Sequence, residues 1–141
     1  MKNLKSTTLP EMSEAQFQRL VIDTAKIYGW LVQHARTTRV ARPDGSVRHA
    51  TAISGNVGFP DLVLARNGRL FFIELKVGRN KPTKAQTQWL NQLAGVVGSA
   101  SDWVSSRDIP TMRGSVTSLV CVAYPRHWEW LREQLRSTRR Q

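Results

Sequence analysis

The chain has 141 residues, of which 40% are hydrophobic, and this is enough to form one globular domain around a single core. Its 21 lysines and arginines outnumber 10 aspartates and glutamates, so the formal net charge is +11. A charge of this size and sign favours nucleic acid as the partner over an anionic membrane surface. No apolar run approaches the roughly 20 residues that a membrane-spanning helix needs, so we expect no membrane partner.

The first predicted element is a helix that begins at Ser13 and ends near Tyr28. Ser13 and Gln16 have the spacing of a capping box, in which each side chain binds the backbone N–H of the other residue. Gly29 ends the helix, and residues 30–35 have the composition of a strand. The helix should bury the side chains that recur at helical spacing, which are Phe17, Leu20, Val21, Thr24 and Tyr28.

Residues 36–58 have no regular apolar pattern, and their arginines face a single acidic residue, Asp44. Segments of this length without regular structure are usually functional or disordered. We therefore predict a long basic loop or a loose hairpin. We expect it to contact the DNA backbone through its arginines, which are Arg36, Arg39, Arg42 and Arg48.

A β-hairpin is predicted in the middle of the chain, with strands at residues 61–65 and 69–77. Asn67 and Gly68, which lie between the two strands, form a strong turn signal. The second strand is apolar at nearly every position, so both of its faces should be buried.

After the hairpin, Thr83 and Gln86 form a second capping box, and we expect a helix from there to about Val97. The remaining segments are an irregular polar stretch, a strand and a helix, at residues 98–114, 116–123 and 126–136. The predicted fold is a mixed α/β domain with a central sheet and flanking helices. This single domain spans residues 13–136, with short tails at 1–12 and 137–141.

The residues with catalytic potential lie at the ends of the two hairpin strands. Glu74 and Lys76 point to the same face of their strand because side chains alternate, and Asp61 opens the partner strand. Two carboxylates close together suit Mg²⁺, and the backbone carbonyl of Leu75 could complete the protein ligands. A lysine beside such a metal can orient the attacking water and stabilise charge on a phosphate. These are the parts that a phosphodiester hydrolase requires.

A purely structural interpretation of these residues is also open. Glu74 and Lys76 could form an ion pair at the strand end, with Asp61 as a turn residue. An isolated Glu-x-Lys triplet is a weak signal by itself. The preceding Gly-Phe-Pro-Asp sequence, the predicted hairpin and the basic charge favour the nuclease interpretation.

Three segments around these residues resemble a known family: residues 58–64 (GFPDLVL), 72–76 (FIELK) and 83–90 (TKAQTQWL). They are similar to the VRR-NUC family of the PD-(D/E)XK nuclease superfamily. Residues 14–18 and 28–30 resemble the opening helix of its short phage and bacterial members, and residues 123–128 resemble their closing strand-to-helix step. The basic segment at 36–58 and the segment at 98–114 fall outside the resemblance.

The resemblance implies a restriction-endonuclease-like fold and hydrolysis of DNA with Mg²⁺ as cofactor, for which Mn²⁺ can substitute. Stand-alone members of the family act as homodimers on branched DNA such as four-way (Holliday) junctions. The resemblance therefore also implies a homodimer that serves DNA recombination and repair in a bacterial or phage-infected cell.

Further site residues follow from the resemblance together with their positions. Glu14 is implied to be an active-site carboxylate that holds the metal or a metal-bound water, although the helix dipole alone favours an acid there. Gln86 is implied to lie near the catalytic pocket, in addition to its capping role. His34 ends the first strand, where it either contacts the scissile phosphate or has a structural role.

Trp89 and Trp103 could stack on bases, and Trp103 could instead form a dimer contact. Trp128 shares one helical face with Leu131 and Leu135, so we expect it in the core. The single cysteine, Cys121, should be a buried free thiol in a reducing compartment, and the N-terminus has no secretory signal, so we expect a cytoplasmic protein.

The leading hypothesis is a metal-dependent endonuclease that acts on branched DNA. A nickase or single-strand nuclease with the same chemistry remains an alternative, as does an RNA-processing nuclease. An alternative from a different class is a non-catalytic, basic DNA-binding protein.

Overall fold

The structure is a computed structural model that describes residues 11–34, 38–50, 54–97, 103–104, 106–115 and 117–137. Its main body consists, in chain order, of α1 (Glu14–Ile27), β1 (Leu31–His34), β4 (Leu62–Arg66), β5 (Arg69–Leu75), α2 (Lys84–Val97), β6 (Thr111–Gly114), β7 (Ser118–Ala123), the 3-10 turn η1 (Pro125–His127) and α3 (Trp128–Arg136).

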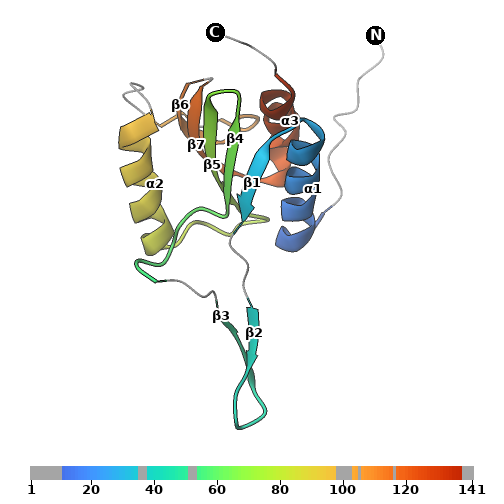
Figure 1. Cartoon of the computed structure of the whole chain (residues 1–141), viewed down its shortest axis with the longest axis vertical. Helices are drawn as coiled ribbons and strands as arrows, with labels where there is room; N and C mark the ends of the chain where they lie inside the picture. Colours follow the sequence, from blue (N-terminus) through green and yellow to red (C-terminus); the bar gives the residue numbers. More distant parts are fainter. Residues whose placement is uncertain are drawn as a thin grey trace.

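The strands of this body form one mixed sheet in the order β1-β4-β5-β7-β6. The β5–β7 pair is parallel, and the other pairs in this sheet are antiparallel. The helices α1 and α3 cover one face of the sheet, and α2 covers the other (Figure 1). The mixed α/β fold with flanked central sheet is therefore as predicted. In the described part of the chain, no helix is long and apolar enough to cross a membrane.

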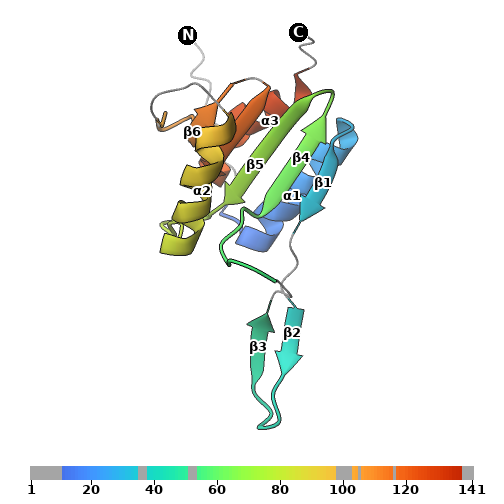
Figure 2. The same ribbon diagram turned by 60° about the vertical axis from the view of Figure 1, so that its left-hand side comes forward.

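A second, two-stranded sheet is formed by β2 (Thr38–Ala41) and β3 (Val47–Ala50), which pair antiparallel. Figures 1 and 2 show this ribbon projecting away from the main body, beyond the end of β1. Its turn is held by Asp44, whose carboxylate accepts hydrogen bonds from the backbone N–H and hydroxyl of Ser46 at 2.9 and 2.6 Å. Of the two expectations for residues 36–58, the hairpin is confirmed.

Both predicted capping boxes are present. The Ser13 N–H donates to Gln16 Oε1 at 2.9 Å, and the Gln16 N–H donates to Ser13 Oγ at 3.2 Å. Thr83 and Gln86 make the corresponding pair at 2.8 and 3.2 Å. Each box satisfies backbone N–H groups that have no partner within the helix, which explains why α1 and α2 begin where they do.

The turn between β4 and β5 is also as predicted. Asn67 and Gly68 have φ angles of +48° and +74°, a left-handed pair that matches the twist of the two strands. This turn fixes the register of the hairpin, so that Leu62 pairs with Ile73. The same register brings Asp61, directly before β4, beside Glu74 near the end of β5.

Each face of the sheet has its own core. Phe71, Ile73 and Leu75 of β5 pack on the α1–α3 side, in a cluster that contains the predicted core residues Trp128, Leu131 and Leu135. Phe72, on the opposite face, packs beneath α2 with Leu90, Val120 and Val122. The expectation that both faces of β5 are covered is confirmed, except that Leu70 is exposed. Cys121 is a buried free thiol, as predicted, and its burial raises its pKa to about 12.

The prediction for residues 98–114 was wrong at its C-terminal end, because Thr111–Gly114 is the edge strand β6. These four residues include a single apolar side chain, Met112, so they carry no strand periodicity. Their extended conformation comes from pairing with β7, which no local pattern reveals. Trp103 is half-buried and packs against the core beneath α2.

Candidate active site

The candidate site lies at the end of β5, on the face of the sheet that α2 covers. Because β5 alternates, Glu74 points toward α2 while Leu75 lies in the core on the opposite face. Glu74 is 1% exposed and Lys76 is 8% exposed, so two charged side chains are buried within three residues of each other. Charges in such positions require partners or a metal.

Glu74 has protein partners on both carboxylate oxygens. Its Oε1 atom accepts a hydrogen bond from Gln86 Nε2 at 2.8 Å and lies 3.2 Å from Lys76 Nζ. Its Oε2 atom accepts a weaker bond from the backbone N–H of Asp61 at 3.3 Å. The three predicted residues Glu74, Lys76 and Gln86 are therefore in direct contact.

Asp61 is joined to the same group through the backbone. One carboxylate oxygen, Oδ2, accepts a hydrogen bond from the N–H of Leu75 at 2.8 Å. Asp61 and Glu74 thus each accept a hydrogen bond from the other's strand segment, which holds the two carboxylates side by side.

The electrostatics of the pair are unfavourable without a further positive charge. Burial is the main cause that raises the pKa of Glu74 to about 7, and the neighbouring negative charge of Asp61 adds to it. Burial also raises the pKa of Asp61. Lys76 opposes both shifts, but one ammonium cannot neutralise two carboxylates.

Gly58 explains how the loop before Asp61 comes so close to α2. Its φ angle is +97°, and a Cβ atom built there would lie 2.6 Å from the backbone carbon of Ala85 and 2.7 Å from the backbone nitrogen of Gln86. A side chain at this position would push the loop away from the first turn of α2. The Gly-Phe-Pro-Asp sequence therefore has a packing reason, which is to bring Asp61 and Gln86 to one site.

Gln86 connects the helix start to the candidate site. Its Oε1 atom completes the capping box with Thr83, while its Nε2 atom donates to Glu74. The predicted cap is confirmed, and the same side chain contacts Glu74. Each bond restrains the amide, so the first turn of α2 fixes the orientation of the Glu74 carboxylate.

Glu14 and His34 lie at the margin of this group. Glu14 is the first residue of α1 and is half-buried. Among the described residues there is no cluster of three or more His, Cys, Asp and Glu side chains that could hold a metal, so Glu14 does not join Asp61 and Glu74 in one. His34 ends β1 near Asp61. Burial raises the pKa of Asp61, and the interaction with His34 slightly offsets this rise.

Three of the predicted DNA-contacting arginines lie in the ribbon: Arg39 in β2, Arg48 in β3 and Arg42 in the turn between them. Arg42 and Arg48 are exposed. Arg36 lies outside the described residues, and so does the side chain of Arg39. Figure 2 shows the ribbon beyond the end of β1, and at that end His34 pairs with Leu62, the residue after Asp61. The ribbon therefore lies toward the same end of the sheet as the carboxylate pair.

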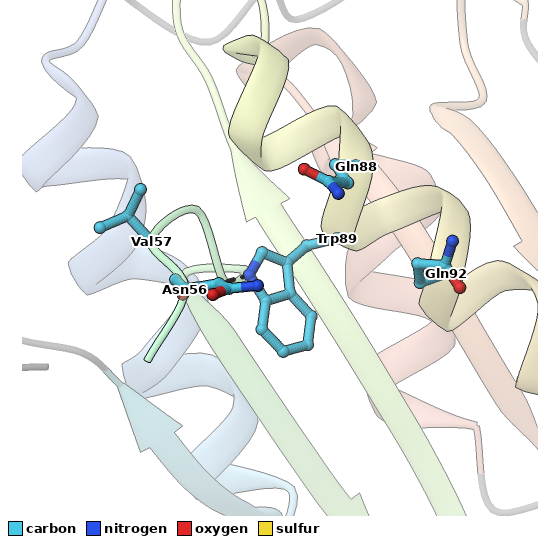
Figure 3. A pocket seen from close by; sticks show the side chains of 5 residues that line it. All are labelled: Asn56, Val57, Gln88, Trp89 and Gln92. Atoms are coloured by element: carbon cyan, nitrogen blue, oxygen red, sulfur yellow. Dashed lines mark hydrogen bonds between the residues drawn. The ribbon is translucent and has the colours of Figure 1, made fainter. Parts of the chain in front are cut away.

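Sequence reasoning missed a pocket beside the site. It is lined by Asn56, Val57, Gln88, Trp89 and Gln92, from the loop before Asp61 and from α2 (Figure 3). Of the residues that line it, only Trp89 was predicted, as a stacking residue. The available signal was the spacing of Gln88 and Gln92, which places two amides on one helix face around an aromatic residue.

Comparison with known proteins gives no match for this chain, whether with family models, with curated proteins or with solved structures. The function of the site is therefore inferred from its own geometry and from the sequence resemblance.

Proposed function

We propose that this chain is a magnesium-dependent DNA endonuclease of the VRR-NUC type, with a restriction-endonuclease-like fold. One observation carries the proposal: Asp61 and Glu74 are held side by side at a buried strand end, next to Lys76. Burial raises the pKa values of both carboxyl groups, and the negative charge of Asp61 raises that of Glu74 further. A divalent cation held by Asp61 and Glu74 would reduce that cost.

The residues present fit Mg²⁺. This ion takes oxygen ligands and is usually held by one or two carboxylates together with waters and substrate phosphates. Asp61 and Glu74 meet that requirement without a third carboxylate, and we assign the backbone carbonyl of Leu75 as a further ligand. Mg²⁺ or Mn²⁺ bound here would supply Lewis-acid stabilisation of the phosphate and a lower pKa for the attacking water.

The side chains of the chain itself have separate tasks in hydrolysis. Water attacks phosphorus and releases a proton to solvent, the bond to the leaving oxygen breaks, and that oxygen takes up a proton from solvent. Negative charge grows on the phosphate oxygens during this step, and Lys76 can donate hydrogen bonds to them. Gln86 is a positioning residue, because its 2.8 Å bond to Glu74 holds that carboxylate in one orientation.

Two features support DNA as the substrate. The net charge of +11 attracts the phosphate backbone, and the exposed Arg42 and Arg48 lie on a ribbon that starts at the same end of the sheet as the site. The preference for branched DNA and the homodimer rest on the resemblance. A two-fold symmetric pair of sites also suits a four-way junction, whose resolution requires two related cuts.

The proposal is tested with purified protein, Mg²⁺ or Mn²⁺, and four substrates: a four-way junction, linear duplex, single-stranded DNA and RNA. We expect cleavage of the junction that disappears with a chelator and in Asp61→Asn and Glu74→Gln proteins. The matched control is Asp23→Asn, which removes an exposed carboxylate from α1 and should leave cleavage unchanged. Full activity in folded Asp61→Asn protein would contradict the metal role of the pair.

The dimer is tested separately. Light scattering at micromolar concentration should give twice the 16.0 kDa mass of the chain. On a junction held in a supercoiled plasmid, a dimer that cuts both strands in one encounter produces linear DNA. A monomer instead accumulates nicked circles, and this result would favour the nickase alternative while leaving the chemistry of the site intact.

A further inference from the structure

The pocket beside α2 has the composition of a base-binding site. Its volume is about 130 Å³, and it lies between α2 and the loop that precedes Asp61. Figure 3 shows the indole of Trp89 reaching from the helix toward this loop, with Asn56 beside it and Gln88 and Gln92 on the helix. The indole N–H donates to the backbone carbonyl of Asn56 at 3.3 Å, which fixes the ring against the loop.

Phe59 holds the indole from a second direction. The two rings meet edge to face at a centroid distance of 5.0 Å, and Phe59 makes the same kind of contact with Phe72 of the sheet at 6.1 Å. Trp89 is therefore anchored to the core through a chain of aromatic contacts. Phe59 is nevertheless 39% exposed and Val57 is 61% exposed, so apolar surface remains open around the pocket.

The polar groups of the pocket are uncharged amides. Within the described part of the chain, the side-chain amides of Asn56, Gln88 and Gln92 make no hydrogen bond. Each amide offers both a donor and an acceptor, so together they can match the edge of any base. No lining residue is cationic, which makes the pocket unsuited to a phosphate group.

The pocket and the carboxylate pair are built on the same two segments. Trp89 follows Gln86 by three residues, which is about 4.5 Å along the helix axis. Val57 precedes Asp61 by four residues, and Gly58 between them lies against the backbone of Gln86. A strand whose phosphate reaches Glu74 therefore passes beside Trp89 within one or two nucleotides.

We propose that this pocket receives one unpaired nucleobase of the DNA strand that is cut, next to the scissile phosphate; this inference rests on the proposed nuclease function. A base inside a duplex hides its ring face by stacking and its pairing edge in the base pair. An unpaired base exposes the face to Trp89 and the edge to the three amides. The site thereby selects DNA with unpaired bases near the cut, and it does so with little sequence preference.

The test combines abasic nucleotides with a pocket variant, in Glu74→Gln protein, so that binding is measured without cleavage. Each nucleotide around a junction's branch point is replaced in turn by an abasic one, and affinity is measured by fluorescence anisotropy. We expect one position, or two adjacent ones, at which loss of the base weakens binding roughly 5- to 100-fold. In Trp89→Ala protein the same replacement should have no further effect, because the base and the ring act as one pair.

Three further variants sharpen this test. Trp89→Phe keeps an aromatic ring for stacking, so removal of the base should still weaken binding to this variant, by most of the factor seen with Trp89. Loss of both amides in a Gln88→Ala, Gln92→Ala protein should reduce that effect by about 2- to 10-fold, and this exposed pair serves equally if Trp89→Ala protein does not fold. Asn91→Ala, an exposed amide of α2 that lines a different pocket with Trp103 and Tyr124, is the matched control and should change nothing.

The outcomes separate the two proposals. The base pocket would be overturned if the affinity were equal at every abasic position. It would also be overturned if loss of the base weakened binding equally with Trp89 present and in Trp89→Ala protein. Both results would count against the pocket even if the enzyme cleaves junctions. The pocket is supported if loss of the base weakens binding at one position, or at two adjacent ones, and if this effect disappears in Trp89→Ala protein. If that position is found while wild-type protein cleaves no substrate with Mg²⁺ or Mn²⁺, the pocket stands and the nuclease function fails.

Discussion

The two ends of the β4–β5 hairpin both bury charge, but they compensate it differently. At the turn end, Arg66 and Arg69 stack on the Trp30 ring, with guanidinium carbons 4.8 and 5.2 Å from its centroid. Their N–H groups donate to backbone carbonyls near the C-terminal ends of α1 and α3, those of Tyr28, Gln134 and Ser137. At the open end, the carboxylates of Asp61 and Glu74 share one nearby ammonium.

This difference separates a structural site from a functional one. Helix C-termini carry partial negative charge, and aromatic faces attract cations, so the fold supplies partners to both arginines. Burial and the charge of Arg66 still lower the pKa of Arg69, but among the described residues no carboxylate pair lies there. At the open end, burial raises the pKa values of both carboxyl groups and the charge of Asp61 adds to the shift of Glu74, so the fold leaves negative charge only partly compensated. Charge that the protein does not neutralise by itself indicates where a ligand is expected.

The largest expected effect is on cleavage, at the open end. Glu74→Gln or Asp61→Asn should reduce the rate at least about 100-fold, because each change removes a metal ligand. The stability of the metal-free protein at neutral pH should not fall, since each change also removes like-charge repulsion. Cleavage rates and urea unfolding of the same samples check both statements. A large loss of stability in Glu74→Gln protein would mean that the pair is structural.

The opposite result is expected at the turn end. Arg69 is 6% exposed and links β5 to the end of α3, so Arg69→Ala should lower the free energy of unfolding by about 3 kcal/mol. The rate of cleavage per folded molecule should remain unchanged, because this end lies a full strand away from Glu74. Urea unfolding measures the free energy of unfolding, and cleavage rates corrected for the folded fraction measure the second quantity. If Arg69→Ala changed the cleavage rate and left the stability unchanged, the turn end would not be a structural site.

Local signals allowed much of the fold to be predicted. The capping boxes at Ser13 and Thr83 and the turn at Asn67 act over a few residues, so the helix starts and the hairpin register follow from sequence. The strand β6 and the parallel β5–β7 pair depend on contacts distant in sequence, so they could not be predicted this way. The burial of Arg69 and the partial burial of Arg66 were missed because an arginine near a turn is ordinarily exposed.

The candidate site was predictable in part for the same reason. Strand alternation and the hairpin place Asp61, Glu74 and Lys76 together, and the structure confirms that they are in contact. The role of Gly58 as a contact point for α2 requires the tertiary packing of a loop on a helix. The amides around Trp89 come from a loop and a helix. The helical spacing of Gln88 and Gln92 could be seen in the sequence, but the position of Asn56 beside them could not.

A smaller effect is expected from pH on the metal-free protein. The pKa of Glu74 is raised to about 7 in the folded state from 4.5, so folding favours its protonated form. The stability from this group is complete below the unfolded pKa and is lost as pH rises through the folded value. From about pH 5 to about pH 8 the loss should be on the order of 2 kcal/mol. Urea unfolding at each pH measures it.

Two comparisons connect this pH dependence to the site. Glu74→Gln should flatten it, whereas Asp23→Asn, which changes an exposed carboxylate, should not. Mg²⁺ should stabilise the protein more at about pH 8 than at about pH 5, because binding requires ionised carboxylates. Equal stabilisation by Mg²⁺ at both pH values would contradict metal binding at this pair.

The smallest effect is expected on the ribbon of β2 and β3, where charge is neither buried nor compensated. Arg42 and Arg48 are exposed, so replacing both with glutamine should leave stability and the cleavage rate at saturating DNA unchanged. Binding should weaken for every sequence alike, and the slope of log affinity against log salt should fall by about 0.9 for each lost phosphate contact. The matched control is Arg132→Gln, since that exposed arginine is already paired with Glu129 at 2.9 Å. An unchanged slope in the double variant would exclude these two arginines as phosphate contacts, and DNA would then have to be held by the basic residues of the main body.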